Sequence, residues 1–314
     1  MLRLRMCMLV LGALIVGPGS GIADPESGVE VRRIEFESYH EMVELFVELG
    51  YTPEAWQAGI REVPRVYITD IPERWRSKTS QEVTTLNKKR LFFRAMAPLV
   101  LRANELIMAD RERLESIRSD RSDSARPAEE EQAWLLDLAG RYSVELSDGE
   151  MTGLDELWTR VDIIPAALAL SQCAEESGWG TSRFASQGNA LFGQWTWGEH
   201  AMKPKHQRKE LGNYGLEAFE SPQQSVLGYM HNLNTHNAYK ALRKNRREIR
   251  AAGQEPSGYV LAESLTSYSE RGEEYVKSLH AIMRVNHLHA VDSAYLEPGG
   301  AMYLVPVGEG INID

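Results

Sequence analysis

Cysteine is scarce in this chain, which has two cysteines, Cys7 and Cys173, among its 314 residues. Cys7 lies in an N-terminal segment that we expect to be removed, so Cys173 has no partner and an intramolecular disulfide is excluded. The small and apolar residues around Cys173 predict a buried, inert thiol and not a nucleophile. The stability of the fold is therefore expected to come from a hydrophobic core.

Basic residues are too few for a nucleic-acid-binding protein. The chain has 35 Lys and Arg against 45 Asp and Glu, which gives a formal net charge of -10. Binding to phosphates requires a basic face, and none is apparent in the sequence. Nucleic acid is therefore not an expected partner.

Long apolar segments are absent after the N-terminus. Arg3 and Arg5 precede an apolar run at 6–16, and small residues follow up to Ala23. This order is typical of a secretory signal, with cleavage expected after Ala23. The run is shorter than the ~20 residues that a membrane span needs. We therefore expect export to the periplasm or cell envelope, with no stable membrane insertion after cleavage of the signal.

Residue patterns divide the chain into five segments. A signal peptide at 1–23 is followed by a mostly helical accessory region at 24–118, which includes helices at 39–49 and from Ser80 to 118. Pro98 predicts a kink or break in the second of these helices. Residues 119–132 mix charge with Ser, Ala and Pro, as is typical of a linker. A second domain at 133–292 and a tail at 293–314 complete the chain.

Helical patterns dominate the second domain. Pro165 begins a helix that Gly178 ends, and Ser221-Pro222-Gln223-Gln224 has the pattern of a capping box at the start of another. The segment 189–219 contains glycines, aromatics and short alternations, which predict loops with a small hairpin. The predicted fold class is therefore α+β, mainly α, with one small β insert. Further helices are expected at 238–250, 258–267 and 272–286.

Glu176 stands in the last turn of the Pro165 helix and precedes Ser177-Gly178-Trp179-Gly180. The negative end of the helix dipole and a neighbouring indole are both expected to raise its pKa. A protonated carboxylic acid is what cleavage of a glycosidic bond requires. Glu175 is its competitor, but it points about 100° away around the helix axis. The alternative is that Glu176 only caps the helix or forms a local salt bridge.

Five blocks of sequence carry a family resemblance. The block SQCAEESGWGTSRFASQGNALFGQWTW resembles the signature of the glucosaminidase domain of glycoside hydrolase family 73. Four further blocks are similar to the Bax-type proteins of that group: YMHNLNTHNAYKALR, YSERGEEYVKSLHAIMRVNHL, VPRVYITDIPERW and KKRLFFRAMAPLVLRANELI.

The resemblance implies a lysozyme-like fold, in which the acid lies at the base of a groove between a helical lobe and a small β lobe. It assigns the acid to Glu176. The implied activity is hydrolysis of the β-1,4 bond on the reducing side of N-acetylglucosamine in peptidoglycan glycan strands, without a cofactor. The alternatives are a lytic transglycosylase on the same substrate and a catalytically silent wall-binding or scaffolding protein.

The second catalytic group is left open by the sequence. A direct-displacement hydrolase needs a base about 6.5–9.5 Å from the acid, and the β insert offers Glu199, Glu210 and Glu217. Glu217 can instead be a solvated strand residue, and Glu210 near Gly212 can lie on a mobile loop. The substrate's own acetamido group can also assist without a second carboxylate. By the resemblance, Tyr268 lines the groove in a loop ahead of a helix, where its phenol is expected to reach the substrate.

Aromatic residues near Glu176 in the sequence are candidates for stacking against sugars. Trp195 and Trp197 flank Thr196, so in an extended segment they share one face. A place in the core is the alternative for these aromatics, above all for Phe192, while Asn189 is expected either to fix a loop or to contact an acetamido group. The substrate-binding candidates are Gln172, Trp179, Asn189, Phe192, Trp195, Trp197, Tyr214 and Tyr275.

The histidines do not have the spacing of a metal site. His231 with His236, and His287 with His289, lack the i, i+4 helical pairing with a catalytic Glu that marks zinc hydrolases. We therefore expect a chelator such as EDTA to leave wall-degrading activity unchanged. Loss of activity that zinc restores would contradict this prediction.

Overall fold

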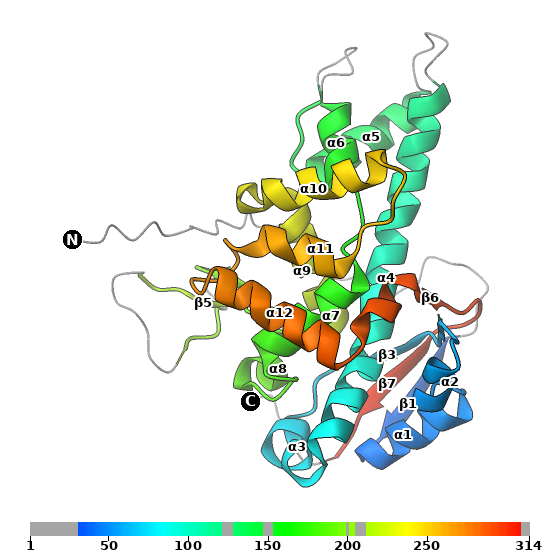
Figure 1. Cartoon of the computed structure of the whole chain (residues 1–314), viewed down its shortest axis with the longest axis vertical. Helices are drawn as coiled ribbons and strands as arrows, with labels where there is room; N and C mark the ends of the chain where they lie inside the picture. Colours follow the sequence, from blue (N-terminus) through cyan, green and yellow to red (C-terminus); the bar gives the residue numbers. More distant parts are fainter. Residues whose placement is uncertain (1–30, 121–127, 147–152, 199–200, 205–211, 309–314) are drawn as a thin grey trace. The chain divides into compact units, whose positions relative to one another are not determined.

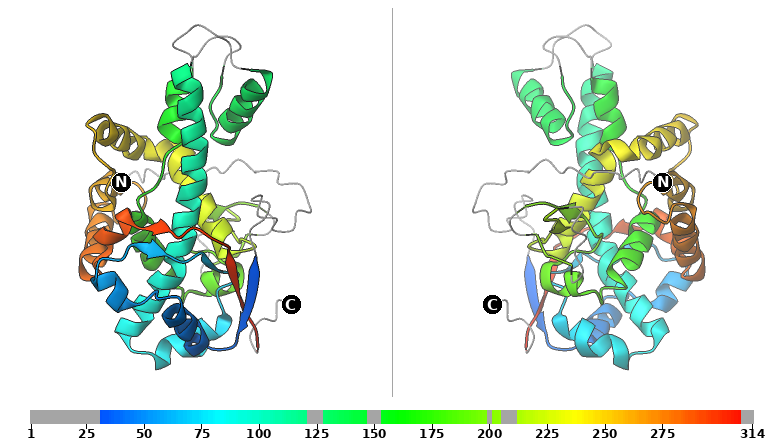
Figure 2. Two further views of the ribbon diagram at one scale, coloured as in Figure 1. Left: turned by 90° about the vertical axis from the view of Figure 1, so that its right-hand side faces the viewer. Right: turned by 90° about the vertical axis from the view of Figure 1, so that its left-hand side faces the viewer.

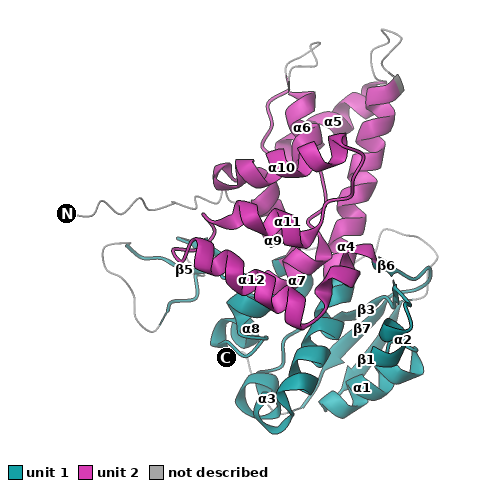
Figure 3. Ribbon diagram, in the orientation of Figure 1, with its two compact units in different colours: residues 1–99, 173–225, 294–314 teal, residues 100–172, 226–293 magenta. Residues whose placement is uncertain are grey.

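A computed structural model describes residues 31–120, 128–146, 153–198, 201–204 and 212–308 (Figure 1). The chain forms two compact units, each built from separate stretches of sequence (Figure 3). Unit 1 comprises residues 1–99, 173–225 and 294–314, and unit 2 comprises residues 100–172 and 226–293. The signal peptide expected at 1–23 lies outside the described residues. The predicted domain boundaries stay predictions.

Unit 1 contains a parallel three-stranded sheet. The central strand β7 (Met302–Pro306) pairs with β1 (Arg32–Phe36) on one side and with β3 (Val66–Ile68) on the other. Figure 2 shows β1 and β7 side by side. A second parallel pair joins β2 (Glu62–Val63) to β6 (Tyr295–Leu296).

These strands add β structure where the sequence predicts none. Strands β1 to β3 lie in the accessory region expected to be mostly helical, and β6 and β7 lie in the expected tail at 293–314. The strands have two to five residues each. Their partners are remote in sequence, so no local periodicity identifies them.

Two short helices lie next to this sheet in unit 1 (Figure 1). Helix α1 (Tyr39–Glu48) begins at Ser38, whose side chain accepts a hydrogen bond from Glu41 N, and it buries Met42 and Phe46. It confirms the helix predicted at 39–49. Helix α2 (Pro53–Gln57) follows, and a π-helical turn η1 (Trp75–Thr79) and α3 (Ser80–Glu82) come after β3.

Helix α4 (Thr85–Asp120) continues through Pro98 for 36 residues. A break at Pro98 is therefore excluded, while the alternative prediction of a kink there stays a prediction. Proline removes one donor and crowds the preceding turn, but Met96, Leu99 and Val100 around it are buried. The packing of these side chains outweighs the local cost. The helix also begins later than expected, because Thr84 and not Ser80 provides the cap, with its Oγ1 accepting from Asn87 N at 3.3 Å.

The remaining part of unit 1 includes the end of α7 (Ala166–Ser177), α8 (Arg183–Gly188) and the start of α9 (Pro222–Thr235). Between α8 and α9, β4 (Trp195–Thr196) pairs antiparallel with β5 (Gly215–Leu216). The predicted hairpin in the β insert is thus confirmed. At α9, Ser221 Oγ accepts from Gln224 N at 3.3 Å, whereas the Gln224 side chain binds Glu220, so only one half of the predicted capping box forms.

Unit 2 is helical in its described part. It holds the later turns of α4 and of α9 and most of α7. The other elements are α5 (Glu129–Arg141), α6 (Leu154–Arg160), η4 (Asn237–Tyr239), α10 (Lys240–Ala251), α11 (Gly258–Ala262), η5 (Glu263–Leu265), α12 (Glu273–Val285) and η6 (Leu288–Ser293). Among the described residues of both units, no helix is long and apolar enough to cross a membrane.

A buried ion cluster around Asp162 organises unit 2. Arg250 makes two bonds to the Asp162 carboxylate, at 2.7 and 2.9 Å. Arg246 lies 3.5 Å from the same carboxylate and also donates to the backbone oxygens of Thr159 and Ile163 at 2.9 and 2.8 Å. Burial lowers the pKa of Arg246 to about 10. The Asp162 charge is therefore needed to compensate a guanidinium that has lost its hydration.

We expect Asp162→Asn to lower the free energy of unfolding by about 3–5 kcal/mol, because it leaves a buried guanidinium without its counter-charge. Urea denaturation monitored by circular dichroism measures this change. Asp155→Asn is the matched control, since Asp155 pairs with Arg118 at an exposed site, where about 0–1 kcal/mol is expected. Equal effects of the two substitutions would contradict the prediction.

Candidate active site

Helix α7 carries Glu176 in its last turn, as the sequence predicts. The backbone then takes three consecutive left-handed residues, with φ of +58° at Gly178, +63° at Trp179 and +74° at Gly180. The Ser177 hydroxyl donates to Cys173 O at 2.6 Å and accepts from Gly180 N at 2.8 Å. The Glu-Ser-Gly-Trp-Gly motif is therefore a helix ending in which the serine ties the turn and two glycines permit it.

Trp179 is the strained member of this turn, since a non-glycine residue seldom has a positive φ. Its ring meets Phe92 and Phe93 edge-on, at centroid distances of 5.8 and 5.1 Å. Lys89 Nζ lies 4.7 Å from the centroid of the ring, and Trp75 Nε1 donates to the Trp179 carbonyl at 2.9 Å. Trp179 thus packs against the first half of α4, and its predicted contact with substrate stays a prediction.

The side chain of Glu176 faces the backbone of the β insert. A Cβ atom added to Gly193 would lie 3.3 Å from Glu176 Oε2, and Gly193 has a φ of +61°. A glycine is therefore required here both for the backbone conformation and for the close approach. Sequence reasoning missed Gly193, although it lies inside the block that carries the family resemblance.

Cys173 lies three residues before Glu176 and is completely buried. Burial raises the pKa of its thiol, and the Glu176 carboxylate raises that pKa further. The predicted burial of this thiol is thus confirmed, and a raised pKa is consistent with a poor nucleophile.

Aromatic residues of the β insert differ in exposure. Trp195 is half-buried and stacks on the buried Tyr214, with ring centroids 4.8 Å apart. Trp197 is 42% exposed, so its indole remains accessible to a ligand. Phe192 is buried in the core, so its ring serves packing, as the alternative to sugar stacking predicts.

Glu217 follows β5 and is half-buried. Burial raises the pKa of its carboxyl group. Its backbone N–H donates to the carbonyl of Gln194 at 2.9 Å, which extends the β4–β5 register by one pair. Within the described chain, Glu217 Oε2 and both polar side-chain atoms of Gln194 are buried without a hydrogen-bond partner. The other two candidate carboxylates, Glu199 and Glu210, lie outside the described residues.

Gln194 was missed by sequence reasoning. It is only 4% exposed, and a buried amide normally has partners for its donor and its acceptor. The sequence alone provides no signal for it, because the feature is the absence of partners in the folded chain.

Asn189 uses its side chain to fix the loop that leads to Gly193. Its Oδ1 accepts from Ile71 N at 3.0 Å, and its Nδ2 donates to Asp70 Oδ1 and to Phe219 O, both at 3.3 Å. Its left-handed φ of +50° suits asparagine. Of the two roles weighed for Asn189, these contacts favour loop fixation.

In unit 2, Gln172 lies in a buried hydrogen-bond network one turn before Glu176 along α7. Its Nε2 donates to Tyr275 OH at 3.0 Å, and its Oε1 accepts from Tyr229 OH at 2.6 Å. Tyr268 is half-buried and stacks on the buried Tyr275, with centroids 5.4 Å apart. Among these residues Tyr268 has the most accessible ring, and the substrate roles predicted for Gln172, Tyr268 and Tyr275 stay predictions.

No group of three or more His, Cys, Asp or Glu side chains within the described ranges has an arrangement that could hold a metal ion. The prediction of metal independence stays a prediction.

Comparisons with known proteins identify the family. Residues 152–288 match the family described as "Glucosaminidase: Mannosyl-glycoprotein endo-beta-N-acetylglucosaminidase". The chain is also 36% identical over 200 residues to "Protein bax" of Escherichia coli (strain K12), which covers 63% of this chain and 70% of that protein. No solved structure matches the chain. The chain is therefore a Bax-type member of the glucosaminidase family.

Proposed function

We propose that this chain is an exported peptidoglycan hydrolase, an endo-β-N-acetylglucosaminidase that cleaves β-1,4 bonds with Glu176 as the general acid. One observation carries the proposal. The family match at 152–288 includes the end of α7 and the β insert, and within it Glu176 Oε2 lies against the backbone at Gly193. The N-terminal order of basic, apolar and small residues supports export.

An acid at the junction of a helix end and a β hairpin suits glycoside hydrolysis. Such an acid can protonate the leaving oxygen of a glycosidic bond when the glycan strand of the substrate lies along the hairpin. This arrangement within unit 1 supports the lysozyme-like architecture that the resemblance implies. The exposed Trp197 and the half-buried Trp195 offer flat apolar surfaces of the kind that bind sugar rings.

Glu217 is the candidate base that the structure describes. A general base works best when its pKa lies near the working pH, and burial shifts the pKa of Glu217 upward, in that direction. The neighbouring Gln194 amide has an unused donor and an unused acceptor. The hydroxyl and acetamido groups of the substrate can supply the missing partners, which would remove the cost of burying both groups unpaired.

The general acid is tested by Glu176→Gln, which keeps the size of the side chain and removes its proton-donating acid. We expect turnover of purified peptidoglycan to fall by about 10²–10⁴ or more, while the thermal midpoint stays near that of the wild type. Zymography together with quantified release of reducing ends measures turnover.

Glu175→Gln is the matched control on the same helix, and its effect should be mild. The assignment of the acid fails if this control is the more damaging of two well-folded variants. Release of anhydro-muramic ends would instead identify a lytic transglycosylase. No clearing by either the wild type or the variants would identify a silent wall-binding protein.

The environment of Glu217 is tested by the pH dependence of stability. Because its pKa is raised in the folded state, its stabilising contribution is fully present below the unfolded pKa of about 4.3 and is lost as pH rises through the folded pKa. We therefore expect Glu217→Gln to gain stability relative to the wild type as pH rises above about 4.3. Urea denaturation across a pH series measures the difference, with the exposed Glu220→Gln as control.

A Glu217→Gln variant that becomes less stable than the wild type as pH rises would contradict this account, since the carboxylate would then be stabilised as an anion. If Glu217 is also the base, the same variant lowers turnover with little change in wall binding. Near-normal turnover would favour assistance by the substrate's acetamido group.

A further inference from the structure

Trp75 holds the turn that follows Glu176. This residue begins η1 in the accessory region, and its indole N–H donates to the Trp179 carbonyl at 2.9 Å. The contact is close, because a Cβ added to Gly180 would lie 3.2 Å from Trp75 Nε1 and 3.4 Å from a ring carbon of Phe92. A side chain at this position would crowd both rings, so Gly180 is what lets Trp75 and Phe92 pack against the turn.

The residues just before Trp75 also hold the segment 189–193, whose backbone faces Glu176. Four and five residues before Trp75, Ile71 N and Asp70 Oδ1 bind the two ends of the Asn189 amide. Asn189 in turn begins the short segment whose Gly193 backbone faces Glu176 Oε2.

A third contact lies between these two. Helix α8 packs against η1, the turn that Trp75 begins. Helix α8 connects the turn at Trp179 to Asn189. Residues 70–75 and the rest of η1 therefore contact three parts of the chain between Glu176 and Gly193, which are the turn at Trp179, helix α8 and Asn189.

We propose that residues 70–75 position the catalytic acid, and that Trp75 is the principal positioning residue. The stretch lies outside the matched glucosaminidase region at 152–288, so the accessory region would supply a part of the active site that the domain itself does not contain. This inference rests on the proposed function, because it takes Glu176 to be the acid.

Strain in the turn explains why such a tether is needed. Trp179 has a left-handed backbone conformation. This conformation crowds the Cβ atom, so a tryptophan adopts it only when neighbouring contacts stabilise it. Only Ser177 and Gly178 separate it from Glu176. A relaxed turn therefore moves the carboxyl group, and a displacement of about 1 Å can cost about 10² in rate.

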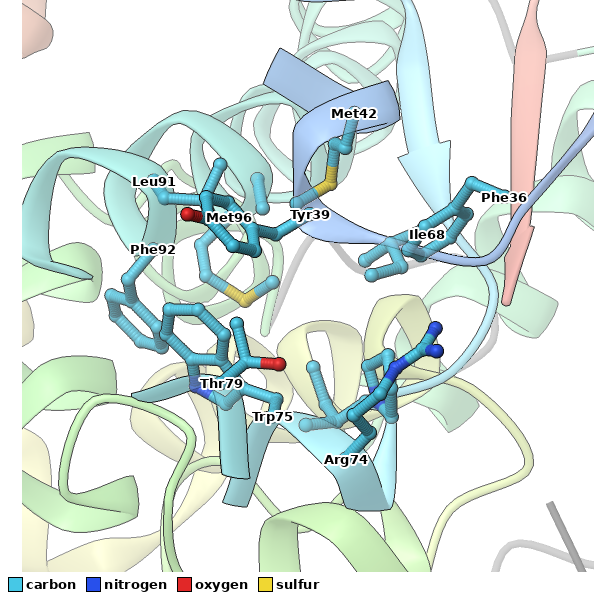
Figure 4. Close-up of a pocket in the computed structure, with 13 residues that line it drawn as sticks. Phe36, Tyr39, Met42, Ile68, Arg74, Trp75, Thr79, Leu91, Phe92 and Met96 are labelled. Carbon is cyan, nitrogen blue, oxygen red and sulfur yellow. The ribbon is translucent and has the colours of Figure 1, made fainter. Parts of the chain in front are cut away.

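The side chain of Trp75 also lines a pocket in the accessory region. Figure 4 shows Trp75 and Phe92 in the wall of a pocket whose other lining side chains include Tyr39, Met42 and Met96. Packing alone thus does not fix the indole on all sides. Its hydrogen bond to Trp179 is the contact that orients it toward the turn.

Trp75→Phe tests the proposal, because it keeps an aromatic ring and removes the N–H donor. On soluble peptidoglycan glycan strands we expect kcat to fall about tenfold, as a partly buried carbonyl loses its donor, while KM changes less than about twofold. Trp56→Phe in α2 is the matched control and should retain both constants. A variant with the kcat of the control would overturn the proposal, and so would one in which only KM changes.

Asp70→Ala provides a second test if Trp75→Phe does not fold. It removes the carboxylate that accepts a hydrogen bond from the Asn189 amide, and we expect about a threefold lower kcat at unchanged KM. Asp155→Ala at an exposed site is its control, and equal kcat values for the two would overturn the proposal. Activity retained by Glu176→Gln would refute the proposed function itself, whereas an inactive Glu176→Gln beside a normal Trp75→Phe would refute only the positioning role.

Discussion

The left-handed backbone at Trp179 is the constraint on which the candidate site depends. Gly178 and Gly180 adopt this conformation at no steric cost, but a tryptophan at φ +63° costs roughly 1–2 kcal/mol. The contacts that offset this cost come from the hydrogen bond of Trp75 and from Phe92, Phe93 and Lys89 on α4. The orientation of the last turn of α7 is thus determined by packing with residues that are remote in sequence.

This dependence extends through unit 1. The stretch at 70–75 follows β3, and β3 is held in place by β7 from the last part of the chain. The same β7 pairs with β1 on its other edge. The segment expected to be a tail therefore provides the central strand of the sheet from which residues 70–75 extend. The accessory region up to Leu99, the end of α7 with its β insert, and the C-terminal strands belong to one compact unit.

Local signals predicted what is local. The helix at 39–49, the end of α7 near Gly178, the cap at Ser221 and the hairpin in the β insert all follow from caps, glycines and periodicity, and the structure contains them. The break at Pro98 was wrong because buried neighbours outweigh the cost of proline. Strands β1, β3 and β7 could not be predicted, since their pairing joins opposite ends of the chain. Trp75 and Gln194 also could not be identified from the sequence. The hydrogen bond of Trp75 to Trp179 and the missing hydrogen-bond partners of Gln194 exist only in the folded chain.

The polar residues of the candidate site fall into two groups, according to the hydrogen bonds that their side chains already make within the protein. Asn189 and Gln172 already have protein partners for both ends of their amides, so a substrate would have to displace bonds to reach them. Gln194 and Glu217 are different, because their buried polar atoms have no partner in the described chain, and each such group costs about 1–3 kcal/mol. Under the proposed function, the substrate would supply the partners that the polar pair at the end of the β4–β5 hairpin lacks. The side chains of Asn189 and Gln172 instead make hydrogen bonds within the protein.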